Sequence, residues 1–175
     1  MSRILLAGLL ALALPVLAAC DSTDDDDDET RDTIADLVVA DADLSTLRAA
    51  VAEADLDDDL AGDGPFTVFA PANSGFQNLL TQLGATPEEL LDRDDLEDIL
   101  ELHVVPARVL SSGLQAGQTV TTLNGETLTV VTVNAGFGLD TEDAGSEANA
   151  VIVDADIEAS NGVIHKIDSV LLPAN

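Results

Sequence analysis

Positive charge and aromatic side chains are both scarce in this chain. Its 175 residues contain 6 Lys+Arg against 34 Asp+Glu, which gives a formal net charge of −28 at pH 7. Nucleic-acid binding requires Lys and Arg to neutralise phosphates, so this composition excludes a nucleic-acid partner. It also excludes adsorption to anionic lipid through side-chain charge. Because Trp and Tyr are absent and Phe occurs only 4 times, aliphatic side chains must build the hydrophobic core.

Cysteine is almost absent as well, since Cys20 is the only one and has no partner for an intrachain disulfide. It follows a basic start and an apolar run over residues 4–19, which is shorter than the roughly 20 residues of a membrane-spanning helix. This pattern is typical of a secretory signal peptide. Leu17-Ala18-Ala19-Cys20 is similar to the end of a bacterial lipoprotein signal, after which the cysteine carries the lipid.

We therefore expect a signal peptide over residues 1–19 and lipidation of Cys20. The protein would cross the inner membrane of a bacterium and stay lipid-anchored in the cell envelope, in the periplasm or at the cell surface. Its first partner would then be the membrane, bound through the lipid at Cys20. An ordinary signal peptide with a chance cysteine is the alternative.

An acidic segment follows the cysteine. Residues 24–29 are five Asp and one Glu, which repel one another, so residues 20–32 are expected to form a flexible tether. A calcium-binding run is the alternative, although nothing in it fixes a coordination geometry. Residues 32–175 still carry 27 acids against 4 bases. Adaptation to high salt, or a basic partner, would account for an acidic surface of this extent.

Hydrophobic spacing predicts several helices in the first half of the remaining chain. Their N-terminal caps are expected at four places: Thr33, Asp43 or Ser45, residues 71–73, and Thr86 with its capping-box partner Glu89. Residues 57–65 are expected to form a loop because they combine an Asp run with Gly and Pro. A short strand is expected over residues 66–69, and a further helix carries apolar residues from Leu96 to His103.

The pattern changes to period two after Pro106, which indicates strands. Asn124-Gly125 predicts a two-residue type I′ hairpin between residues 119–123 and 126–133. Two further strands are expected at residues 150–157 and 163–172, joined by a turn. With helices first and strands later, the sequence predicts an α+β fold with an antiparallel-rich sheet.

The chain offers little catalytic or metal-binding chemistry. His103 and His165 are the only histidines, and neither lies in a metal-ligand spacing. The Asp-rich run from Asp55 starts like an EF-hand loop but has Leu60 where Gly is needed and Phe66 where Glu is needed. Because no nucleophile motif is present either, we expect no catalytic residue, no cofactor and no metal site.

Three ordered segments resemble the fasciclin domain family. They are residues 64–76 (GPFTVFAPANSGF), residues 102–106 (LHVVP) and residues 155–168 (ADIEASNGVIHKID), followed by Val-Leu-Leu-Pro at 170–173. The resemblance predicts a fasciclin domain over residues 33–173, with N-terminal helices packed on an antiparallel-rich β wedge. It implies a role in cell-surface adhesion and no enzymatic activity. The middle segment departs from the family pattern, because Leu102 stands where the family usually has tyrosine.

The resemblance also singles out candidate interaction residues. Asp156-Ile157 matches a position associated with adhesion in animal members of the family, and His103 belongs to the middle segment. A structural interpretation competes for each of them. Ile157 would then be a core residue, Asp156 an edge carboxylate, and His103 a buried ring bonded to backbone groups. His165 would also be buried in this way.

Two functional hypotheses follow. The first is a membrane-anchored envelope protein that mediates adhesion or binds a protein or glycan surface ligand. The alternative is an envelope protein that binds a small molecule or carbohydrate, which requires a defined pocket with convergent polar groups. An enzyme would require an acid/base cluster that the sequence does not show.

Overall fold

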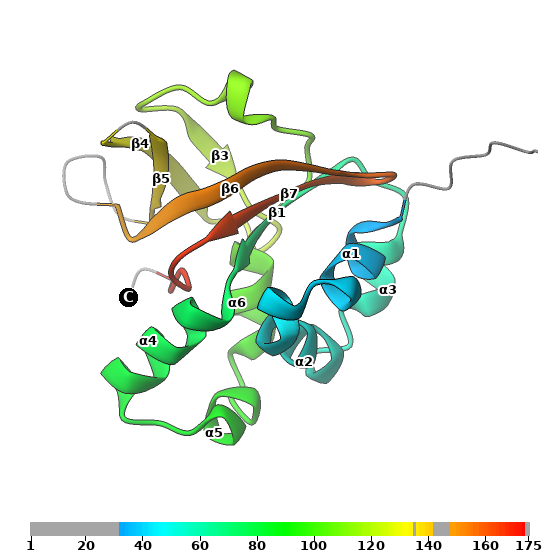
Figure 1. Ribbon diagram of the computed structural model, residues 1–175, viewed down its shortest axis with the longest axis vertical. Helices are drawn as coiled ribbons and strands as arrows, with labels where there is room; N and C mark the ends of the chain where they lie inside the picture. The colour runs from blue at the N-terminus through cyan, green and yellow to red at the C-terminus, as the bar shows by residue number, and fades with distance from the viewer. Residues whose placement is uncertain (1–31, 135, 142–147, 174–175) are drawn as a thin grey trace, which may run out of the picture.

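A computed structural model of the protein describes residues 32–134, 136–141 and 148–173 (Figure 1). The expected signal peptide, Cys20 and nearly all of the acidic tether lie outside these residues. The helical elements are α1 (Ile34–Ala40), η1 (Ala42–Leu44), α2 (Ser45–Glu53), α3 (Asp57–Ala61), α4 (Asn73–Leu83), α5 (Pro87–Leu91), α6 (Leu96–Leu102) and η2 (Ser111–Gly113). The strands are β1 (Phe66–Pro71), β2 (Val104–Val105), β3 (Thr119–Thr121), β4 (Thr127–Val133), β5 (Gly136–Asp140), β6 (Ala150–Ala159) and β7 (Gly162–Ile167).

The strands form one sheet in the order β2-β1-β7-β6-β5-β4-β3. All neighbours are antiparallel except β1 and β7, which run parallel from the pair Phe66–Gly162 to the pair Pro71–Ile167. The Leu123 amide, just after β3, donates to the Val104 carbonyl of β2 at 2.8 Å. The two ends of the sheet therefore meet, and the sheet closes into a wedge. The predicted α+β class and the antiparallel-rich sheet are confirmed.

Two hydrophobic clusters fill the molecule, and aliphatic residues dominate both. The first packs α1 to α6 against β1 and β7, and Figure 1 shows the helices gathered on one side of these strands. The second fills the inside of the wedge and includes Phe69, Leu128, Leu139 and Leu171. Leu102 is fully buried in this second cluster. The position where the family usually has tyrosine is thus a core position in this chain.

Two helix caps are confirmed and two are placed differently. Thr86 forms the expected capping box with Glu89, and Thr33 caps α1 as expected and also forms a capping box, with Asp36. No side chain close to α2 in the sequence caps the N-terminus of this helix. Its Thr46 amide instead donates to the Asn73 side chain at 2.9 Å. Asn73 does not cap α4, as its sequence position suggested, but fastens α2 across the molecule.

Three further expectations need correction. Residues 57–61 are a helix and not a loop, because three Asp side chains in its first turn favour the helix N-terminus and Leu60 supplies a buried anchor. Strand β5 forms where no strand was expected. The last strand ends at Ile167, because the backbone of Asp168 instead bonds the Val151 carbonyl at 3.0 Å and leaves the β1–β7 ladder.

The hairpin at Asn124-Gly125 exists but has a different turn. The Thr122 amide donates to the Glu126 carbonyl at 2.9 Å, so three residues connect the strands where two were expected. Gly125 alone adopts a left-handed conformation, with φ 85°. The Asn124 side chain accepts from the Thr122 hydroxyl at 2.6 Å and the Glu126 amide at 3.0 Å. This bonding keeps Asn124 out of the left-handed region that a type I′ turn requires.

The β6–β7 turn holds the helical half and the sheet together through Asn161. Its Oδ1 atom accepts from the Ile34 amide at 2.9 Å. Its Nδ2 atom donates to the carbonyls of Leu60 at 2.7 Å and Gly62 at 2.9 Å. Its carbonyl accepts from the Phe66 amide at 3.0 Å. One side chain thus bonds the start of α1 and the end of α3, while its backbone bonds the start of β1.

Glycine is required on both sides of this contact. A Cβ atom on Gly64 would lie 1.9 Å from the Asn161 carbonyl oxygen, and one on Gly162 would lie 2.1 Å from the Phe66 carbonyl oxygen. Both distances are far below van der Waals contact. The sequence therefore carries Gly at 64 and 162 because two backbone segments touch there.

Replacing Asn161 with Ala is expected to lower the free energy of unfolding by about 2–4 kcal/mol, because three backbone groups lose their partner. Chemical denaturation measures this change. Asn78→Ala is the matched control, since the Asn78 side chain makes no hydrogen bond within the described residues and is exposed. Equal stability of the two variants would contradict the role assigned to Asn161.

Candidate functional site

Asp156 lies in a bulge of strand β6. Asp154 pairs with Lys166 and Ile157 pairs with Ile164, so Ala155 and Asp156 together face the single residue His165 on β7. Asp156 has φ 60°, in the left-handed region, and its amide donates to the His165 ring nitrogen Nδ1 at 3.1 Å. The side chain of His165 therefore replaces the backbone acceptor that the bulge removes.

The carboxylate of Asp156 is bonded within the protein. It accepts from the Ser111 amide at 2.7 Å and also from the Ser111 hydroxyl. The hydroxyl bond is the main cause that lowers the pKa of Asp156 below its usual value. Ile157 is half-buried and packs on the helix-side core. The structure thus places both candidate residues in the framework, with Asp156 holding the start of η2.

The segment from Ala107 to Ser111 is fastened to the sheet by side chains. The Thr67 hydroxyl donates to the Ala107 carbonyl at 2.6 Å and accepts from the Val109 amide at 2.8 Å. His165 Nε2 donates to the Val109 carbonyl at 2.8 Å. Because Nδ1 of the same ring accepts from Asp156, His165 is the neutral tautomer with its proton on Nε2. Its ring is fully buried and stacks on Phe69, with 5.6 Å between ring centroids.

His103 has the opposite tautomer. Its Nδ1 atom donates to the Ile99 carbonyl at 2.6 Å, and its Nε2 atom accepts from the Leu171 amide at 2.9 Å. The residue is only 2% exposed, and this burial lowers its pKa to about 4. His103 is therefore a neutral bridge between α6 and the C-terminal segment, and its ring does not reach the surface. The two histidines lie at different places and do not form a joint site.

Three of the four basic residues in the described part of the chain form ion pairs. Lys166, the only lysine, pairs with Asp41 at the end of α1, and their hydrogen bond raises the pKa of Lys166 and lowers that of Asp41. Arg108 pairs with Glu158 at 3.0 Å, and Arg93 pairs with its near neighbour Asp95. The remaining carboxylates leave the domain strongly acidic. Within the described ranges, no group of three or more His, Cys, Asp or Glu is arranged to hold a metal ion.

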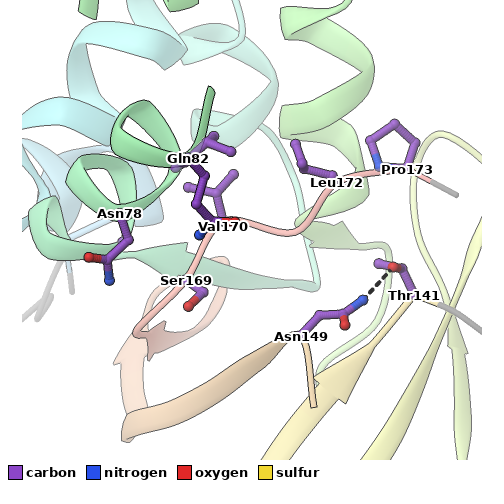
Figure 2. Close-up of a pocket in the computed structure, with 10 residues that line it drawn as sticks. Asn78, Gln82, Thr141, Asn149, Ser169, Val170, Leu172 and Pro173 are labelled. Carbon is purple, nitrogen blue, oxygen red and sulfur yellow. Dashed lines mark hydrogen bonds between the residues drawn. The ribbon is translucent and has the colours of Figure 1, made fainter. Parts of the chain in front are cut away.

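A cleft of about 460 Å³ lies between α4, the end of β5, the start of β6 and the C-terminal segment (Figure 2). Its polar lining consists of carboxamides and hydroxyls: Asn78, Gln82, Thr141, Asn149 and Ser169. Its apolar lining consists of Leu79, Val170, Leu172 and Pro173. The side-chain Nδ2 atom of Asn149 donates to the Thr141 hydroxyl at 2.7 Å. The sequence pattern does not reveal this cleft, because Asn78 and Gln82 have the spacing of an ordinary solvent-exposed face of an amphipathic helix.

Comparison with known proteins identifies the family. The model of the fasciclin domain matches residues 42–173. The chain belongs to the fasciclin domain family. Protein sll1483 from Synechocystis is 41% identical over 145 residues, which cover 81% of this chain and 73% of that protein. Human periostin is 32% identical over 141 residues, which cover 81% of this chain but only 16% of periostin.

A solved structure supports the fold of this fasciclin domain. The FAS1 domain pair from the insect cell adhesion molecule fasciclin I superimposes with a TM-score of 0.67 at 20% sequence identity. The match covers 81% of this chain and 51% of the insect chain. At this identity the likeness concerns the fold. Among the described residues, no helix has the length and apolar character needed to cross a membrane.

Stability is expected to fall between about pH 6.5 and pH 4 because His103 resists protonation in the folded state. Its folded pKa of about 4 lies below the unfolded value, so the unfolded state binds the proton first as the pH falls. The stabilisation is complete above the unfolded pKa. Its loss amounts to about 3 kcal/mol. Denaturation of wild type and His103→Gln across this range isolates the effect, and parallel profiles would contradict it.

The hydrogen bonds that Ser111 donates to the Asp156 carboxylate give a second test. Asp156→Ala is expected to lower the free energy of unfolding by about 1–3 kcal/mol and to speed hydrogen exchange of the Ser111 amide. Because the folded pKa of Asp156 is lowered, the stabilisation is present at neutral pH and lost as the pH falls through that pKa. Asp154→Ala on the same strand is the control. Unchanged exchange at Ser111 in Asp156→Ala would refute the assignment.

Proposed function

We propose that this protein is a lipid-anchored member of the fasciclin family that mediates adhesion or contacts a protein or glycan ligand outside the inner membrane of a bacterium. The observation that carries the proposal is the family match over residues 42–173. The related insect domain pair comes from a cell adhesion molecule. The lipoprotein-like sequence ending at Cys20 supplies the proposed attachment.

The proposed organisation places three parts in order along the chain. Residues 1–19 are removed as a signal peptide, residues 20–32 form the lipidated cysteine and acidic tether, and residues 33–173 form the displayed domain. Several acyl chains at one cysteine hold firmly, since each buried CH₂ contributes about 0.8 kcal/mol. Acid repulsion from anionic headgroups would keep the tether extended. The acidic domain would then face outward, toward its ligand.

A non-enzymatic role agrees with the state of the histidines. General acid/base catalysis needs a titratable group within reach of substrate. His103 and His165 are buried, and the nitrogens of both rings bond protein groups. The carboxylate of Asp156 likewise accepts a hydrogen bond from Ser111. We therefore treat these residues as the framework that shapes the displayed surface.

A second candidate function is the binding of a small molecule or carbohydrate in the envelope. The cleft beside α4 favours it, because polar side chains from three separate segments line one hollow of a volume typical of ligand sites. This candidate and the first are compatible, since a displayed domain can bind glycan through such a cleft.

The anchor is tested by replacing Cys20 with Ala. Wild-type cells fed labelled palmitate are expected to yield labelled protein in the membrane fraction. The Cys20→Ala protein should be unlabelled and leave the membrane fraction, because it has no thiol to acylate. Ser22→Ala is the matched control and should behave like wild type. Equal labelling of the Cys20→Ala and wild-type proteins would refute lipid anchoring.

A further inference from the structure

We infer that the cleft between α4 and the C-terminal segment is a binding site for a neutral saccharide. This inference rests on the second candidate function and names its site and ligand class. Figure 2 shows the polar side chains around the cleft, with Asn78 and Gln82 on α4, Ser169 on the C-terminal segment, and Asn149 with Thr141 across from them.

The absence of charge in the lining separates this cleft from the rest of the surface. Charged residues make up 23% of the chain, yet none of the ten described residues that line this cleft is charged. Two other clefts of comparable volume, about 450 and 500 Å³, both have charged linings. The first of these includes Glu53, Asp92 and Arg93, and the second includes Asp63 and Arg108. The described lining of this cleft is thus polar without charge, which fits an uncharged ligand.

The polar groups have the chemistry that sugar hydroxyls require. Each carboxamide offers an acceptor and two donors, and each hydroxyl offers both kinds of bond. Neighbouring hydroxyls of a sugar need this combination, because each of them donates and accepts. Within the described part of the chain, the side chains of Asn78, Gln82 and Ser169 make no hydrogen bond to protein groups. They are therefore available to a ligand.

The apolar residues of the lining also suit a sugar ligand. Leu79, Val170, Leu172 and Pro173 line the same cleft, and they can cover the C–H face of a sugar ring. A phosphate or carboxylate ligand would find no cation in this lining and would face the repulsion of a chain with a net charge of −28. The described lining thus favours a neutral polyhydroxyl compound over an anion.

The walls are held before any ligand binds. A Cβ atom on Gly75 would lie 2.9 Å from the Asp168 carbonyl oxygen, so α4 rests directly on the C-terminal segment. The Leu171 amide is held by His103, and the Asp168 side chain accepts from the Val151 amide at 2.8 Å. Fixed walls reduce the ordering cost of binding. The backbone on both sides of the cleft is therefore positioned by buried bonds.

The test uses the full-length protein in detergent and follows its amide signals by NMR. The probes are maltose, cellobiose, lactose and N,N′-diacetylchitobiose at millimolar concentration, with glucose 6-phosphate and glucosamine as charged comparisons and triglycine as a neutral peptide. At least one neutral sugar is expected to shift the signals of Gly75 and Ser169, while the charged probes and the peptide shift neither. Binding of none of the sugars, or stronger binding of a charged probe or of triglycine, would overturn the inference.

Matched variants on one helix assign the binding to the cleft. Gln82→Ala and Asn78→Ala are expected to weaken sugar binding about tenfold each, because each removes a hydrogen-bonding carboxamide. Gln77→Ala removes an exposed carboxamide of the same helix that does not line the cleft, and it should bind like wild type. Equal binding by all three variants would overturn the assignment. Palmitate labelling of Cys20 is independent of these residues, so failure here leaves the anchored-display proposal standing.

Discussion

The contact between the β6–β7 turn and the loop before β1 is the constraint on which the rest of the fold depends. Strands β1 and β7 are parallel neighbours, yet they are the first and the last strand of the domain in sequence. Closing so long a connection costs chain entropy. The contact at Gly64, Asn161 and Gly162 offsets this cost by bringing two backbones together and by giving Asn161 three side-chain bonds. Because these bonds reach α1 and α3, the same contact also positions the helical layer.

Polar side chains hold the irregular segments in place by hydrogen bonds to their backbone, as the backbone bonds between neighbouring strands hold the sheet. The chain between β2 and β3 has little regular structure, yet Thr67, His165 and Asp156 bond its backbone in succession. The segment after β7 is held in the same way by His103 through Leu171. Each such group costs free energy unless it is fully bonded. A network bonded on every side therefore selects one arrangement of these segments, and the C-terminal arrangement is what forms one wall of the cleft.

Local signals in the sequence predicted local structure well. The capping boxes at Thr33 and Thr86 depend only on residues three apart, so the sequence contains all of their chemistry. Asn73 and Asp156 could not be assigned in this way, because their partners lie 27 and 45 residues away. The α+β class followed from the change of period, whereas α3 was missed because its Asp run also suits a loop. The resemblance supplied the family and its arrangement of helices on a β wedge but not the cleft.

The cleft shows the same limit of prediction from sequence, because its residues are far apart in the chain. Its lining comes from α4, from both sides of the β5–β6 connection and from the C-terminal segment, and nothing in the spacing of these residues relates them to one another. The sequence signal that could have pointed to the cleft is the lack of charged residues along α4. Elsewhere in the domain the carboxylates have local uses, as at the first turns of α3, α5 and α6, where they favour the helix N-terminus. Among the α-helices of the described residues, α4 alone has no charged residue along its length. Its exposed face is therefore neutral in a strongly acidic chain, and two side chains of that face, Asn78 and Gln82, line the cleft.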